Sequence, residues 1–147
     1  MEESNSSKKE VVQTLLNFDE TLAICTIYMY TRDYSFNLKL AFSNLIKNRM
    51  RKEFFSDGTI IGTIFYPFQF QLWSNKSERI ELIESFNKSL NNRNDLYMDC
   101  LKAWKSNKEI INKDCIMFVD KNDINNENVI EETFNLDKEI DKFEFYK

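Results

Sequence analysis

The side chains best suited to chemistry lie at a polar corner between two apolar stretches. An apolar and aromatic run over residues 24–30 ends in Thr31-Arg32-Asp33, and a helical pattern begins again near Ser35. An apolar helix that leads into such a corner, followed by a second packed helix, can hold a site there. The same residues also fit a plain two-helix hairpin of a core, and the residues taken alone favour that interpretation.

The composition removes the commonest active-site chemistries. The chain contains no His, which is the usual general base and the usual ligand of transition metals. Its three cysteines lie far apart and form no CxxC pair: Cys25, Cys100 and Cys115. We expect them to be reduced, mostly buried thiols in a cytosolic setting. A catalytic cysteine is not expected, because the chain offers no His partner to activate it. We therefore expect no metal and no cofactor.

Length and charge indicate one acidic globular domain. The chain has 147 residues, a net charge of −4, a pI near 5.0 and 42% hydrophobic residues. We expect a single domain over residues 9–147 after a disordered stretch at 1–8. The charge gives no support to general nucleic-acid binding. No apolar run approaches the ~20 residues that cross a bilayer, and the N-terminus lacks the features of a signal peptide. We therefore expect synthesis in the cytoplasm. Incorporation into a virion and release on lysis are the alternatives for its later location.

Helices are expected on both sides of the polar corner. The sequence predicts a short helix that ends near residue 17, one over residues 19–32 and another over 35–51. Ser35 is the expected N-cap of the third helix, because its hydroxyl can accept from a first-turn N–H. The apolar residues of this helix recur at spacings of three and four: Leu38, Ala41, Phe42, Leu45 and Ile46.

The next part of the chain mixes strand and helix signals. A turn is indicated at Asp57-Gly58, after which residues 59–66 fit a short helix or a strand equally well. Residues 68–73 alternate like a strand. A helix is expected from an N-cap at Ser77, with four residues on its buried side: Ile80, Ile83, Phe86 and Leu90.

The last third predicts a helix and a small sheet. A helix begins at Asp95, and apolar residues 115–119 form a buried strand. Residues 120–139 are polar and are expected to form a long surface loop, and residues 143–146 alternate as a closing strand. The predicted fold class is α+β: a mainly helical single domain with a small, partly antiparallel sheet.

Two motifs at the corner resemble those of a known family. Residues 27–34 have the sequence IYMYTRDY, and residues 39–50 have KLAFSNLIKNRM. Later stretches contain Gln69-Phe70 with Trp73 nearby, and the chain ends in FEFY before its last residue. The order and spacing resemble the spore-cortex-lytic (SleB-type) cell-wall hydrolases, in which I-Y-x-E-A-R-G-E precedes a helix with Q-x-A-V-A-x-V-x-x-N-R-V.

This resemblance implies a lysozyme/transglycosylase-like fold that acts on peptidoglycan, but it departs from the family at the chemistry. Tyr30 occupies the position of the family's glutamate, and Tyr34, Asp33 and Phe143 replace its second Glu, its Gly and its closing His. Glycoside cleavage needs an acid that protonates the leaving oxygen, and a phenol with a pKa of ~10 is a poor donor. Asp33 is the nearby carboxylate that could substitute for the lost glutamate.

The resemblance also implies a set of site residues. Tyr30 and Asp33 stand at the catalytic position, and five residues would bind a glycan strand: Arg32, Asn48, Gln69, Phe70 and Trp73. For Asn48 a structural role in the helix is an equal alternative, and Phe70 fits an edge strand of the core somewhat better.

Three hypotheses for the function remain open. The first is a peptidoglycan hydrolase-like protein, of phage or viral origin and catalytically degenerate, that binds or formerly cleaved glycan strands. The second is a non-enzymatic structural or protein-interaction module on the same scaffold, for example a virion component with other viral or phage proteins as partners. The third is an unrelated helical interaction domain whose resemblance to the family is accidental.

Overall fold

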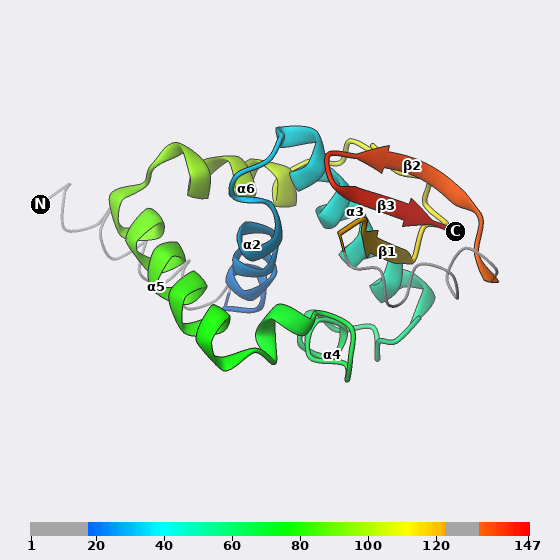
Figure 1. The fold of residues 1–147 in the computed structure, drawn as a ribbon, viewed down its shortest axis with the longest axis horizontal. Coiled ribbons are helices and arrows are strands. Elements are labelled where there is room, and N and C mark those ends of the chain that lie inside the picture. Colours follow the sequence, from blue (N-terminus) through cyan, green and yellow to red (C-terminus); the bar gives the residue numbers. More distant parts are fainter. Residues whose placement is uncertain (1–17, 123–132) are drawn as a thin grey trace, which may run out of the picture.

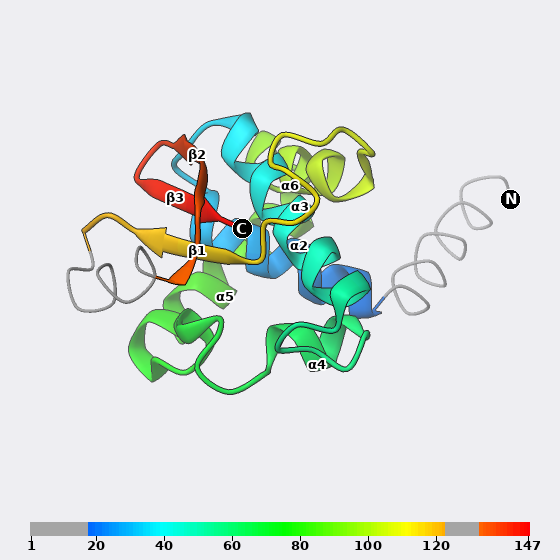
Figure 2. The ribbon, with the colours of Figure 1, turned by 90° about the vertical axis from the view of Figure 1, so that its right-hand side faces the viewer.

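The computed structural model describes residues 18–122 and 133–147 of the chain, so the predictions for residues 1–17 lie outside it. The described part is mainly helical and carries one small antiparallel sheet, as the α+β prediction requires. Figure 1 and Figure 2 show the strands gathered on one side of the helices. None of the described helices has the length and apolar character needed to cross a membrane.

Helix α2 (Phe18–Thr31) runs through the interior of the helical part. Every residue from Ala23 to Met29 is buried, because α3, α4, α5 and α6 surround the helix. A helix that is apolar on all sides can be stable in water only when it is covered in this way. Its buried hydroxyls find partners: Thr26 donates to the Leu22 carbonyl at 2.9 Å, and Thr31 donates to the Ile27 carbonyl at 2.6 Å.

Helix α3 (Phe36–Lys52) follows the corner and confirms the predicted cap. The Leu38 N–H donates to the Ser35 hydroxyl at 3.2 Å, and the expected apolar face is buried. Three cations in the last turn complement the helix dipole: Arg49, Arg51 and Lys52. The helix ends at Glu53, which adopts a left-handed conformation with φ of 52°.

The segment between α3 and the next long helix is helical wherever it is regular. Residues 59–66 contain α4 (Ile60–Ile64), with Thr59 as its N-cap, so the helix alternative is confirmed. The strand predicted over residues 68–73 is wrong: a turn leads into a 3-10 helix, η1 (Gln71–Trp73). Alternation alone misled the prediction, because a short alternating run needs a partner strand, and none of the described strands pairs with residues 68–73.

Two further helices complete the helical part, α5 (Lys76–Asn92) and α6 (Asp95–Lys105). The N-cap of α5 is Asn75, whose side chain accepts from the Glu78 N–H, so the prediction of Ser77 as the cap is wrong by two residues. The buried face is also turned relative to the expected one. Ile80 is exposed, while Leu82, Phe86 and Ser89 are buried.

The sheet has the strand order β1-β3-β2, with both pairs antiparallel: β1 (Met117–Asp120), β3 (Phe143–Tyr146) and β2 (Leu136–Ile140). The predicted closing strand is therefore the central one, and all four of its residues are buried. The long loop predicted over 120–139 is wrong at its end, where β2 forms, while residues 123–132 lie outside the described part. Strand β2 is a charged edge strand without apolar alternation, so pairing with β3 determines it.

The sheet attaches to α3 through rings. Phe42 of α3 contacts three rings of the sheet in edge-on geometry, Phe118 at 5.0 Å, Phe143 at 5.1 Å and Phe145 at 5.6 Å between centroids. Such pairs add stability beyond their buried area. The sheet is thereby fixed above the corner that follows α2.

Burial of two thiols predicts a loss of stability in mild alkali. Burial raises the pKa of Cys25 and of Cys100 to about 12, whereas unfolded thiols titrate near ~8.5. Because the folded pKa is raised, the stabilisation is complete below the unfolded pKa and is lost as the pH rises toward 12. The free energy of unfolding, measured with urea between about pH 8 and 9.5, should fall by up to about 1.4 kcal/mol per pH unit for each thiol.

The matched control is the double variant Cys25→Ala/Cys100→Ala. Its unfolding free energy should depend less steeply on pH over the same window, even if the variant is less stable at every pH. An equal slope in both proteins would contradict the assignment.

Candidate functional site

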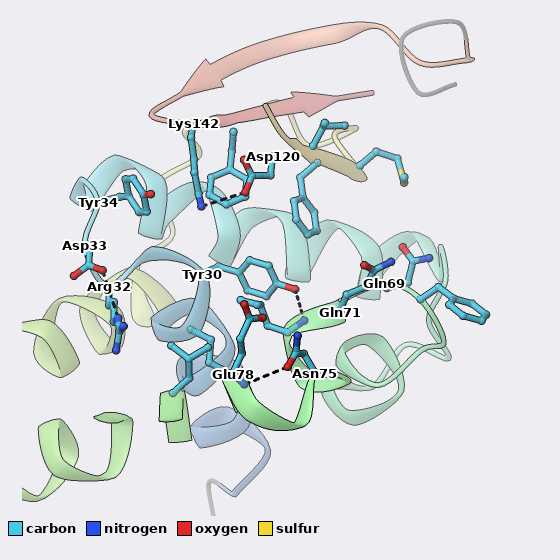
Figure 3. Close-up of a pocket in the computed structure, with 18 of the residues that line it drawn as sticks. Tyr30, Arg32, Asp33, Tyr34, Gln69, Gln71, Asn75, Glu78, Asp120 and Lys142 are labelled. Carbon is cyan, nitrogen blue, oxygen red and sulfur yellow. Dashed lines mark hydrogen bonds and ion pairs between the residues drawn. The ribbon is translucent and has the colours of Figure 1, made fainter. Parts of the chain in front are cut away.

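A pocket of about 660 Å³ opens between the helices and the sheet (Figure 3). It is lined by the corner that follows α2, the segment that enters η1, the first turns of α5, strand β1 and the turn before β3. The volume is within the ~300–1,000 Å³ typical of ligand sites. The corner singled out by its sequence therefore does border a pocket.

Tyr30 lies at the centre of this pocket (Figure 3). Its ring stacks on Phe42 at 5.2 Å and meets Phe70 and Phe118 edge-on. The Leu72 N–H donates to its hydroxyl oxygen at 3.2 Å. Burial raises the pKa of Tyr30 well above its ordinary value. The Leu72 N–H and the charge of Arg49 lower this pKa, and the negative charge of Glu78 raises it, but burial has the largest effect. The phenol is thus a weaker acid here than in water.

A buried lysine holds the corner in shape. Lys39 is only 2% exposed, and its ammonium group donates to the carbonyls of Thr31 and Tyr34, both at 2.8 Å. These carbonyls lie where α2 ends, so the lysine replaces the helical N–H groups that are missing there. Ser35 ties the same corner to the sheet, because its N–H and hydroxyl both donate to the Asp141 carboxylate.

The rim of the pocket carries charges of both signs. Arg32 pairs with Asp33 at 3.4 Å and with Glu81 at 3.7 Å, and its guanidinium also donates to the Ser85 hydroxyl. Across the opening, Lys142 pairs with Asp120 at 3.1 Å (Figure 3). Glu78 has no ion-pair partner among the residues that the structure describes. The four acids of the rim outnumber its two cations, so the rim is net negative, and Glu78 is the acid that no described cation pairs with.

Arg49 also lines the pocket, although only 1% of its surface is exposed. Its Nε–H donates to the Ile116 carbonyl at 2.7 Å, and its guanidinium lies over the rings of Phe70 and Phe118. Burial lowers the pKa of Arg49, the electrostatic interaction with Tyr30 raises it by less, and the result is a pKa of about 10. The side chain remains a cation at neutral pH.

The structure brings together four of the seven site residues expected from the sequence. Tyr30, Arg32, Asp33 and Gln69 all line the pocket. Tyr30 and Gln69 come from segments about forty residues apart, and the packing of η1 against α2 joins them.

The other three expected residues have structural contacts in place of a position in the lining. The Asn48 amide donates to the carbonyls of Asn112 and Cys115 and thereby fixes the segment before β1. Phe70 is 2% exposed and belongs to the ring cluster beneath the pocket. The Trp73 indole N–H donates to the Thr26 hydroxyl at 3.0 Å, and its ring contacts Phe65.

Several lining residues have no counterpart in the sequence analysis: Glu78, Glu81, Met117, Asp120 and Lys142. Glu78 and Glu81 share one face of α5 at a spacing of three, a signal the sequence does contain. Asp120 and Lys142 come together only when β1 pairs with β3, so no local pattern marks them.

No group of three His, Cys, Asp or Glu residues within ranges 18–122 and 133–147 is arranged to hold a metal ion. Comparison of the chain with family models, with curated proteins and with solved structures gave no match.

The hydrogen bond between Leu72 and Tyr30 predicts a specific loss of stability. Tyr30→Phe keeps the ring but leaves the Leu72 N–H without its acceptor, which costs about 1–3 kcal/mol for a buried group. Urea unfolding should show this loss. Tyr66→Phe is the matched control, because that ring is exposed and lies outside the pocket lining, and it should change the unfolding free energy by less than about 0.5 kcal/mol.

Proposed function

We propose that this protein is a catalytically degenerate relative of the cell-wall hydrolases, with a lysozyme/transglycosylase-like fold, whose pocket binds a peptidoglycan glycan strand. The observation that carries the proposal is the position of Tyr30. The residue that aligns with the family's glutamate lines a pocket between helices and sheet, and its side chain is a phenol.

The lining of the pocket suits a sugar better than a purely apolar ligand. Hydroxyl and amide groups of a glycan need hydrogen-bonding partners, and the rim offers Gln69, Gln71 and Asn75 beside its charged residues. Rings at the base of the pocket, Tyr30 and Phe118, offer apolar surface to the faces of a sugar. The mixture supports binding of a polar ring compound.

The same pocket argues against glycosidase chemistry at the family's position. A general acid must release its proton near neutral pH, and burial makes the Tyr30 phenol a still weaker acid. Asp33 is a poor replacement, because its side chain is 74% exposed and pairs with Arg32. An apolar pocket is what turns a carboxylic acid into a general acid, and Asp33 does not lie in one.

A second candidate function is a protein-interaction module, for example a virion component. The observation that favours it is a group of exposed apolar side chains around α4: Phe55, Ile61, Phe65, Tyr66 and Phe68. Phe68 is 85% exposed. Exposed apolar surface gathered in one place is typical of contact sites between proteins.

Binding to cell walls tests the first proposal. The protein should sediment with purified peptidoglycan and should leave the turbidity of a cell-wall suspension unchanged. Gln71→Trp places a large ring in the pocket lining and should weaken sedimentation by about tenfold or more. Asn87→Trp adds the same ring on the exposed side of α5, outside the lining, and should bind like the wild type.

Turbidity measurements distinguish a site that has lost its catalytic acid from one that is catalytically active. A gain of lysis in Tyr30→Glu would mark position 30 as a former acid. Lysis by the wild type that disappears in Asp33→Ala or Glu78→Gln would contradict the degenerate assignment and locate the acid. Failure to sediment, with intact folding, would favour the interaction module.

A further inference from the structure

The base of the pocket contains a buried cation with an unused donor group. Arg49 is 1% exposed, and its Nη1 has no hydrogen-bond partner among the described residues. No carboxylate in that part of the chain lies within ion-pair distance of it. A buried charge without a partner is costly, so such groups are rare in folded proteins unless a ligand uses them.

The other guanidinium nitrogens show which part of the cation is free. Nε donates to the Ile116 carbonyl at 2.7 Å, a strong bond that fixes the side chain. Within residues 18–122 and 133–147, the one hydrogen-bond partner of Nη2 is the Met117 sulfur at 3.9 Å, and a thioether is a weak acceptor. Arg49 and Met117 line the same pocket. Among the described residues, the two terminal nitrogens therefore have no hydrogen-bond acceptor stronger than a sulfur.

We infer that Arg49 forms an anion subsite at the base of the pocket and binds the carboxylate of an acidic sugar through Nη1 and Nη2. A guanidinium group matches a carboxylate with two parallel hydrogen bonds, which no uncharged group reproduces. The subsite rests on the proposed function, because the sugar to which the carboxylate belongs is taken to be part of the glycan.

The charges at the rim favour a single carboxylate over a phosphate. Seven side chains of the lining are charged at neutral pH, four of them acidic and three basic: Asp33, Glu78, Glu81, Asp120, Arg32, Arg49 and Lys142. Arg32 and Lys142 offset only two of the four acids, so the rim stays net negative, and Glu78 is the acid without an ion pair among the described residues. A doubly charged phosphate would be repelled by Glu78 more strongly than a monoanion.

The ring cluster completes the subsite. Phe70 and Phe118 stack at 5.8 Å between centroids, and the Arg49 carbon Cζ lies 5.1 Å and 5.7 Å from them. These rings exclude water from the guanidinium group, which strengthens its attraction for an anion. They also hold the guanidinium plane in place before any ligand arrives.

The test compares two ligands that differ only in charge. Titration of ¹⁵N-labelled protein with D-glucuronate should shift the Arg49 Nε–H signal and the amide signals of Met117 and Phe118. D-Glucuronamide, which has the same shape without the charge, should bind at least about tenfold more weakly. Inorganic phosphate should also bind more weakly than glucuronate.

A pair of variants tests the subsite without removing Arg49, whose bond to Ile116 supports the fold. Met117→Glu places an internal carboxylate beside the guanidinium and should abolish the glucuronate shifts while raising the urea midpoint. Met117→Gln has the same size without the charge and should retain binding.

Three results would overturn the subsite: equal affinity for glucuronate and its amide, shifts confined to residues outside the pocket, or binding by Met117→Glu as tight as by Met117→Gln. If these appear while the protein still sediments with peptidoglycan, the glycan proposal stands and the carboxylate subsite falls. If sedimentation fails and glucuronate still shifts Arg49, the subsite stands and the peptidoglycan assignment falls.

Discussion

Burial of α2 on every side is the constraint on which the rest of this structure depends. A helix without a polar face has to be surrounded, and α3, α4, α5 and α6 supply the cover. The helix can reach solvent only at its ends. Its last turns bring Tyr30 to the boundary of the core, and the corner that follows emerges beside the pocket. The position of the pocket is thus a consequence of how the central helix is covered.

Two buried cations on α3 show two ways of placing a charge in the interior. Lys39 donates to two backbone carbonyls that the end of α2 leaves free, so its charge serves the fold. Arg49, almost three turns further along, uses Nε for the fold, and its Nη1 has no hydrogen-bond partner among the described residues. The contrast assigns a structural role to the lysine and a ligand-binding role to the arginine. The ring cluster that links α3 to the sheet makes both arrangements rigid.

Acid chemistry at Tyr30 is disfavoured by the same packing that places the residue in the pocket. The rings of Phe42, Phe70 and Phe118 remove water from the phenol, and the Leu72 N–H occupies its oxygen. Desolvation raises the pKa of any neutral acid, and the effect would suit a carboxylic acid but not a phenol. A pocket that would activate a glutamate therefore leaves a tyrosine inert, which agrees with a binding role.

The sequence by itself determined the helices around the corner, the cap at Ser35, the strand at residues 143–146 and the place of the corner between two helices. These features follow from local rules, since helical periodicity, capping and alternation act within a few residues. It did not determine η1, the charged edge strand β2 or the burial of Arg49. Each of these depends on partners far along the chain: η1 packs on α2, β2 pairs with β3, and Arg49 bonds to Ile116. Tertiary structure alone decided which charges face the pocket, because a side chain's partners are fixed by packing and not by its neighbours in sequence.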